Sequence, residues 1–409
     1  MKNGWQTKPL GEILQKTETV NPLDSPETEF NYIDVSSVSN VTFQIEETQR
    51  LKGRDAPSRA RRLVKANDVL FATVRPTLRR IAVVPEHLDN QVCSTGYFVL
   101  RPKTGISHRF VFYALFTEDF MGQMESFQKG ASYPAVTDGE VRSQVIPVPP
   151  LPEQERIVGV LDEAFDDIAT AKANAEKNLQ NPRDIFQSYL QSVFTQRGPG
   201  WVERRLTDVC EKITDGTHQT PTYHDKGVIF LSSRNVTSGK INWDDIKYID
   251  HKQHVEMHKR VAPRPNDILL AKNGTTGVAA IVDRDVTFDI YVSLALLRAK
   301  NEILPQLLLY FINSPVAKHQ FNKRLKGIGV PNLHLEEIRE VVISFPNSLT
   351  EQKAIATKLD DLLEETQRLE FIYKQKLAAL DALKKSLLHQ AFTGELSKPS
   401  EQFLQEALP

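Results

Sequence analysis

Arginine and lysine gather between Arg50 and Arg80, where ten basic residues occur with only two acidic ones, Asp55 and Asp68, a local charge of +8. The whole chain has a net charge of −1 at pH 7, so the basic charge is local. Guanidinium and ammonium groups neutralise phosphates, and arginine also pairs with the edge of guanine. This stretch therefore predicts contact with phosphate groups, as in a nucleic acid.

Candidate DNA-contacting residues occur in both halves of the chain. Arginine suits guanine, asparagine and glutamine suit adenine, and other polar side chains contact bases or phosphates. In the first half the candidates are Arg59, Arg61, Arg62, Arg75, Arg79, Arg80, Lys129, Ser132 and Tyr133. In the second half they are His218, Gln219, Thr220, Lys272, Asn273, Thr275, Thr276, Arg324 and Lys326. Any one of them alone could be a solvated surface residue, so the prediction rests on the clusters.

Three histidines could do a different chemistry. His251, His254 and His258 are spaced three and four apart, with Glu256 between them. On a helix this spacing places them on one face, which is the geometry of a zinc-binding helix. Lysines flank the group and the first half has no matching cluster, so the favoured interpretation is a polar, solvated helix without a metal.

Motifs for catalysis are missing from the sequence. Gly274-Thr275-Thr276-Gly277 lacks the lysine and helix start of a phosphate-binding loop, so a tight turn is expected there. The close acidic pairs at 244–245 and 283–285 also favour turns over a nuclease metal site. Neither a Walker A signature nor the Asn/Asp-Pro-Pro-aromatic motif of adenine methyltransferases occurs. We therefore expect a chain that binds and does not catalyse.

The elements that position these residues occur twice, because the chain repeats itself. Matching segments at an offset of 196 to 199 residues include Gly4-Trp5 and Gly200-Trp201, Asn67-Asp68 and Asn266-Asp267, Gly130 and Gly327, and Glu153-Gln154 and Glu351-Gln352. A period this long indicates two tandem domains. Such a pseudo-dimer is suited to a target that also has two parts.

Each half combines a mixed part and a helical part. Residues 1–148 alternate short apolar strands with turn residues, and one helix is expected from about His108 to Gln128. After the proline-rich segment 147–152, apolar residues step by three and four, as in a coiled coil. The predicted seam residues are Ile157, Leu161, Ile168 and Leu179, then Ile355, Leu359, Leu362, Leu369, Leu380, Leu383 and Leu387.

The predicted fold class is α+β with mixed sheets: two pseudo-symmetric α/β domains, and two long helices that pack as an antiparallel coiled coil. The α/β domains cover 1–148 and 198–346, the helical regions 149–197 and 347–396, and a tail 397–409. Pro182 should kink or break the first helix near Asn181, because proline lacks an amide donor. The alternative is that each helix packs only on its own globule.

Composition favours a cytoplasmic protein. Each half of the 409-residue chain, 40% hydrophobic, can bury its own core. Cys93 and Cys210 occupy non-equivalent positions and make neither a disulfide framework nor a zinc pattern. The first residues do not resemble a signal peptide, and no run of 18 apolar residues occurs.

Several strings together resemble one family, the specificity subunits of type I restriction-modification systems, over essentially the whole chain. They are "PLPEQERI" and "SLTEQKAI" at the starts of the two helical regions, "DGTHQTP" from Asp215, "NDVLFATVRP" and "NDILLAKNGTTG" at equivalent strands, and "KGASYPAV" and "KGIGVPNL" from Lys129 and Lys326. The first half lacks the Gly-Thr-His run. The two domains should therefore read different bases.

The resemblance implies a non-catalytic subunit that recognises double-stranded DNA. Each α/β domain would be a target-recognition domain for one half of a split, asymmetric target, and the helices would set the spacer and dock two modification subunits. S-adenosylmethionine would bind to those partners, ATP and Mg²⁺ to partner subunits including the restriction subunits, and no cofactor to this chain. The alternative is a coiled-coil scaffold or adaptor that does not touch DNA.

Overall fold

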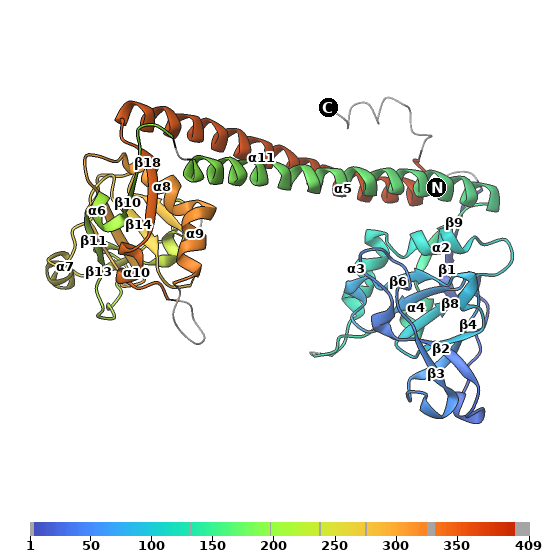
Figure 1. Ribbon diagram of the computed structural model, residues 1–409. Coiled ribbons are helices and arrows are strands. Elements are labelled where there is room, and N and C mark those ends of the chain that lie inside the picture. The colour runs from blue at the N-terminus through green and yellow to red at the C-terminus, as the bar shows by residue number, and fades with distance from the viewer. Residues whose placement is uncertain are drawn as a thin grey trace. The chain divides into compact units, whose positions relative to one another are not determined.

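The computed structural model describes residues 4–130, 132–196, 198–236, 239–274, 276–324 and 332–396. It divides into two compact units, one of residues 1–175 with 375–409 and the other of residues 176–374. Each unit contains one α/β globule and parts of the two long helices, α5 (Leu151–Thr195) and α11 (Leu349–Thr393) (Figure 1). Among the described residues, no helix is long and apolar enough to cross a membrane.

The first globule contains two larger sheets and a strand pair. The sheets have the orders β3-β2-β7-β4 and β6-β5-β8, and β1 pairs with β9. The strands are β1 (Gln6–Pro9), β2 (Glu29–Ile33), β3 (Gln49–Lys52), β4 (Ala60–Val64), β5 (Val69–Ala72), β6 (Ile81–Val83), β7 (Gln91–Ser94), β8 (Tyr97–Leu100) and β9 (Val145–Val148). The helices are α1 (Leu10–Ile13), α2 (His108–Ala114), α3 (Glu118–Phe127) and α4 (Asp138–Arg142), with short 3₁₀ turns η1 (Pro22–Asp24), η2 (Val35–Ser37), η3 (Gly53–Asp55), η4 (Pro76–Leu78) and η5 (Glu86–Leu88).

The single helix expected from His108 to Gln128 is two helices, α2 and α3. Thr117 is the N-cap of α3: its side chain accepts a hydrogen bond from the backbone N–H of Phe120. A threonine in this position caps a new helix and so competes with continuation of the previous one. The apolar stripe passes through both helices, which is why its periodicity did not reveal the break.

The second globule repeats this plan. Its sheets have the orders β11-β17-β14-β15 and β13-β12-β16, and β10 pairs with β18. The strands are β10 (Trp201–Arg205), β11 (Cys210–Asp215), β12 (Val228–Leu231), β13 (Lys247–Ile249), β14 (Ile268–Ala271), β15 (Ala279–Ile281), β16 (Phe288–Ile290), β17 (Leu294–Ala299) and β18 (Val342–Pro346). The helices are α6 (Leu206–Val209), α7 (His251–His258), α8 (Pro305–Asn313), α9 (Pro315–Asn322) and α10 (Leu335–Arg339), with a 3₁₀ turn η6 (Ser233–Val236).

The duplication extends from topology to individual polar contacts. The parallel pair β2 and β7 corresponds to β12 and β16, and β6-β5-β8 corresponds to β15-β14-β17. Arg101 makes two hydrogen bonds to the buried carboxylate of Asp68, and Arg298 makes the same two to Asp267. A buried carboxylate is stable when a guanidinium binds it through two hydrogen bonds. This pair therefore anchors the equivalent strand in each globule.

The long helices pack together and also complete the core of each unit. In the first unit, Ile157 and Leu161 of α5 share a core with Leu388 and Ala391 of α11. In the second unit, Leu190 of α5 lies in the same core as other residues of α5 and α11. None of the predicted seam residues is exposed. The predicted pairing of the helices is confirmed, and the alternative, in which each helix packs only on its own globule, does not describe this arrangement.

Pro182 does not interrupt α5, which stays helical from Leu151 to Thr195, so the predicted break near Asn181 is absent. The neighbouring Arg183 makes two hydrogen bonds, of 2.6 and 2.8 Å, to the carboxylate of Glu370 on α11. This ion pair ties α5 to its partner helix at the turn where the proline removes a backbone hydrogen bond.

A buried glutamine fixes the start of each long helix. The side-chain oxygen of Gln154 accepts a hydrogen bond from the backbone N–H of Ser107, and its amide donates to the carbonyl of Pro149. Gln352 makes the equivalent bonds to Leu304 and Pro346. Both glutamines are completely buried. The repeated Glu-Gln of the sequence therefore marks the point at which the first turn of each long helix is hydrogen-bonded to its globule.

Candidate nucleic-acid interface

Two exposed arginines in the first globule occupy a strained turn after β5. Arg75 and Arg79 flank the 3₁₀ turn η4 and have positive φ angles of 50° and 53°. Residues other than glycine seldom adopt this left-handed conformation, and where they do the strain is common at functional sites. Both side chains are exposed. The turn therefore presents two guanidinium groups to solvent.

A second loop, after α3, meets this turn. The backbone N–H of Arg75 donates to the carbonyl of Pro134 at 2.7 Å, and its guanidinium donates to the carbonyl of Ser132 at 3.3 Å. The same guanidinium lies 5.1 Å from the centre of the Tyr133 ring, which is 72% exposed. The backbone of Lys129 forms an antiparallel β-bridge with Ala135 in the same loop. The structure thus brings together Arg75, Arg79, Lys129, Ser132 and Tyr133, which we call the first reading surface.

Most of the remaining basic residues between Arg50 and Arg80 already have acidic partners from outside the stretch. These ion pairs are Arg50–Glu29, Lys52–Glu27, Arg54–Glu27, Arg62–Asp138 and Lys65–Glu18. The local charge of +8 therefore does not require an anionic ligand for its neutralisation. Fewer basic residues than the sequence indicates are therefore left without an acidic partner among the described residues.

Two of the candidate arginines bind groups of the protein itself. Arg62 pairs with Asp138 at 2.8 Å, and Arg80 donates to the backbone carbonyls of Ser36 and Val38. Their guanidinium groups are thereby committed to the protein, so we remove both from the set of DNA-reading candidates. Arg61 is half-buried and donates to the carbonyl of Ala60, whereas Arg59 is exposed.

The second globule joins the same two loops. Asn273, after β14, forms an antiparallel bridge with Asn332, as Val74 does with Ala135 in the first globule. Gly274 and Gly277 have positive φ angles of 79° and 89°, so the Gly-Thr-Thr-Gly segment turns tightly, as predicted. Thr276 donates within the turn to the carbonyl of Lys272. Of the predicted residues here, Thr275 and Lys326 lie outside the described residues.

Lys272 was expected to contact DNA, but it is buried. Its side chain is 7% exposed and its ammonium lies 2.6 Å from the carboxylate of Asp215, which is 5% exposed. A lysine paired in this way is held inside the globule, so the structure favours a role for Lys272 as the counter-ion of Asp215 over the predicted DNA contact. Arg324 is half-buried and donates to the carbonyl of Gln320 near the end of α9.

Asp215 gathers a polar cluster at the end of β11. Besides Lys272, its carboxylate accepts a hydrogen bond from Arg260 at 2.5 Å and lies 3.3 Å from Nε2 of His218. Burial opposes ionisation of Asp215, but the hydrogen bonds from Lys272 and Arg260 outweigh it and lower the pKa of the carboxyl. The next residue must be glycine, since a Cβ on Gly216 would lie 1.9 Å from the carbonyl oxygen of Ile290.

His218, Gln219 and Thr220 follow this anchor, and all three are exposed, as their predicted role requires. Together with Arg260 they form what we call the second reading surface. Arg260 was not among the predicted DNA-contacting residues, although basic residues, Lys259 and Arg264, lie close to it in the sequence. No local signal joins it to His218, which lies 3.3 Å from its guanidinium but 42 positions away in the chain.

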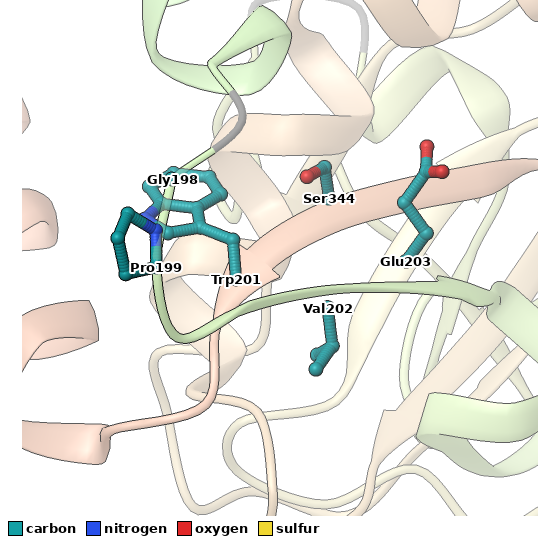
Figure 2. Close-up of a pocket in the computed structure, with 6 residues that line it drawn as sticks. All are labelled: Gly198, Pro199, Trp201, Val202, Glu203 and Ser344. Atoms are coloured by element: carbon teal, nitrogen blue, oxygen red, sulfur yellow. The ribbon is translucent and has the colours of Figure 1, made fainter.

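A shallow hollow of about 360 Å³ lies at the start of β10 in the second unit (Figure 2). Figure 2 shows Trp201 and Glu203 on one side of the strand and Val202 on the other, the alternation of a β-strand. Its described lining, completed by Gly198, Pro199 and Ser344, offers one carboxylate and one hydroxyl. This set lacks the base or second acid that would activate a nucleophile.

Comparison with known proteins agrees with this two-part architecture. The family model described as "Type I restriction modification DNA specificity domain" matches twice, over residues 2–179 and 199–378. The chain belongs to the family of type I restriction-modification specificity subunits. This specificity subunit is 22% identical to the type I restriction enzyme EcoBI specificity subunit of Escherichia coli over 339 residues, which are 76% of this chain and 70% of the relative.

Solved structures agree over nearly the full length. A chain from a structure on complex assembly and conformational transition of the type I R-M system is 29% identical, with a TM-score of 0.85, over 97% of this chain and 99% of that one. The HsdS subunit from Thermoanaerobacter tengcongensis is 28% identical, with a TM-score of 0.67, over 97% and 98%. The resemblance seen in the sequence is confirmed, and it favours DNA recognition over a scaffold that does not touch DNA.

Proposed function

We propose that this specificity subunit reads a double-stranded DNA target in two halves, one with each globule. The observation that carries the proposal is the recurrence of one loop pair, after β5 and α3 in the first globule and after β14 and α9 in the second, with different side chains. Arg75 of the first globule corresponds to Gly274 of the second. The two globules therefore share a backbone arrangement of the loops but present different side chains from it, which suits an asymmetric target.

The two reading surfaces would contact DNA in different ways. In the first, the guanidinium of Arg75 is held over the Tyr133 ring, which limits its rotation and leaves its outer edge for a guanine or a phosphate. In the second, Arg260 and His218 are oriented by one buried carboxylate. Fixing a side chain before binding lowers the entropy lost on association.

The helix pair would dock the modification subunits. In the second unit, Ile185 of α5 is 66% exposed and Phe371 of α11 is 60% exposed, and Leu349 and Ile372 of α11 are exposed as well. Exposed large apolar side chains on a helix are suited to a partner protein. We place S-adenosylmethionine on the modification subunits, and ATP and Mg²⁺ on the partner subunits. This chain would act in the cytoplasm as a non-catalytic subunit.

The test is co-expression of the chain with a modification subunit, followed by single-molecule sequencing of the host genome to map methylated adenines. We expect a bipartite motif with a fixed, unspecified spacer. Replacement of residues 1–148 by the corresponding domain of another specificity subunit should change one half of the motif and leave the other half intact. A complex that forms but methylates no motif would refute DNA recognition.

A further inference from the structure

Two of the three histidines on α7 contact a buried carboxylate, whereas the sequence predicted a polar helix that faces only solvent. Nδ1 of His254 lies 2.7 Å from one oxygen of Asp289, and Nδ1 of His258 lies 2.9 Å from the other. The side chains of His254 and His258 are 13% and 31% exposed, and that of Asp289 is 1% exposed. Asp289 lies on β16 and is 31 residues beyond His258, so no local pattern in the sequence pointed to this partner.

We propose that His254, His258 and Asp289 form a binding site for a divalent transition-metal ion such as Zn²⁺. One ligand atom from each residue lies within 4.8 Å of the other two. Two imidazole nitrogens and one carboxylate oxygen are a common ligand set for a zinc ion that keeps a fourth position open for water. The partial exposure of His258 leaves a side of the site from which water can enter.

The positions of the three residues follow from the elements that carry them. His254 and His258 are four residues apart on α7, and residues with this spacing lie on the same helix face. Asp289 lies between Phe288 and Ile290, whose side chains enter an apolar core. Because side chains alternate along a strand, Asp289 points to the opposite face, where α7 packs through Met257.

The distances are short for an ion but need little change to admit one. Zinc bonds of about 2.0–2.2 Å place tetrahedral ligand atoms about 3.3–3.5 Å apart, so the imidazoles would recede from the carboxylate by roughly 0.4–0.8 Å. An aspartate is seldom buried this fully unless it is paired or binds a metal. A divalent ion would balance the charge of the Asp289 carboxylate directly.

An ion here would have a structural consequence for the second reading surface. His258 precedes Arg260 by two residues, and Arg260 donates to Asp215. Fixing the end of α7 would therefore also fix the segment that carries Arg260. The metal site itself does not depend on DNA recognition, because it is defined by contacts within the globule.

The experiment uses the full chain, stripped with EDTA, dialysed and titrated with Zn²⁺ while bound metal and the midpoint of thermal unfolding are measured. The variants are His254→Gln, His258→Gln and Asp289→Asn. His319→Gln is the control, since His319 is an exposed histidine on α9 of the same unit. Circular dichroism without metal checks that each variant is folded. Co²⁺ gives a second signal through its visible absorption when bound in a tetrahedral site.

We expect wild type and His319→Gln to bind about one equivalent of Zn²⁺ and to gain thermal stability from it. Each ligand variant should lose at least ten-fold in affinity and lose that gain in stability. The proposal is overturned if wild type binds no ion, or if His254→Gln and His258→Gln bind Zn²⁺ as wild type does. It is equally overturned if the ligand variants are merely less stable, with Zn²⁺ stabilising none of the proteins. DNA recognition would remain untouched by any of these results.

Discussion

The exposed charge of a residue in this chain depends on whether the fold already uses it. Arg62, Arg80 and Lys272 are basic in sequence, but carboxylates or backbone carbonyls of the protein hold them. Arg75 and Arg79 lie on strained backbone and remain exposed, and the guanidinium of Arg75 contacts only one carbonyl, of Ser132, and the Tyr133 ring among the described contacts. The side chains available to DNA are therefore a minority of those that composition indicates.

Replacing Arg75 by alanine should weaken binding of the specificity–modification complex to its cognate DNA. A lost base contact costs about 1–3 kcal/mol, or about 5- to 150-fold in affinity, and lowers discrimination in one half of the motif. A lost phosphate contact instead lowers the salt slope by about one. Fluorescence anisotropy over a salt series separates the two. Arg50→Ala is the matched control, since Arg50 is exposed but paired with Glu29; an equal loss there would argue against the first reading surface.

Replacing Lys272 by methionine should destabilise the second unit. Removing one member of a buried ion pair costs about 3–5 kcal/mol, and the lower end is expected because Arg260 still binds Asp215. Urea unfolding measures this loss. Arg264→Met, at an exposed position, should have little effect by comparison.

The same pair predicts a pH dependence. The pKa of Asp215 is lowered below its ordinary value of 3.8, so the stability that this group contributes is present above pH 3.8 and is lost as the pH falls through the lower, folded-state pKa. The stability difference between wild type and Asp215→Asn should therefore shrink on acidification. A difference that is constant from neutral pH to about pH 3 would contradict this assignment.

At the scale of elements, the two units share their buried polar contacts, which join strands and helices, more closely than they share their surface loops. The arginine–aspartate anchors and the buried glutamines have the same partners in both units, whereas the loops differ in sequence. Joints tolerate little change because a buried polar group that loses its partner is costly. Loops at the surface have no such constraint and can diverge toward different bases.

Gln154→Leu and Gln352→Leu should each lower the free energy of unfolding by about 1–3 kcal/mol for every buried N–H or carbonyl left unpaired. The loss should be similar in the two units. The reason is that leucine fills the space but cannot bond the backbone of the preceding globule. Hydrogen exchange at Ser107 and Leu304 would report the local loss. Gln191→Leu, at an exposed site on α5, is the control; an effect as large as in the buried pair would contradict the joint role.

At the scale of the whole molecule, each unit is closed by residues far apart in the chain. The first unit combines residues 1–175 with 375–409. Leu388, Ala391 and Leu396 of the last segment are buried in the core that also contains Phe110 of α2. The core of the first unit is therefore completed by residues of α11 and the segment after it, more than 270 positions beyond Phe110.

Ending the chain after Lys374 should destabilise the first unit selectively. The truncation removes Leu388 and Leu396 from its core, at about 1.5–3 kcal/mol for each buried leucine. It also removes Phe392, whose ring lies 4.9 Å from that of Phe110. Hydrogen exchange should rise in α2 and stay unchanged in α8. Truncation after Leu396 is the control and should leave both helices protected; an equal rise in α8 would contradict the division into units.

The sequence by itself determined the duplication, the α/β class and the two long helices that pair. These features are periodic or repeated along the chain, so the order of the residues reveals them without any knowledge of which residues meet in the fold. It also located the loops that carry Arg75, Tyr133 and His218, because polar residues clustered there.

Only the tertiary structure decided which of those side chains remain available. The partners of Lys272, of Arg260 and of His258 lie 57, 45 and 31 residues away. Whether a lysine is a ligand for DNA or a buried counter-ion, and whether a histidine is solvated or faces a carboxylate, depends on which distant strand packs beside it. Hydrogen bonds and ion pairs act over a few ångströms, and only folding brings such distant groups within that range.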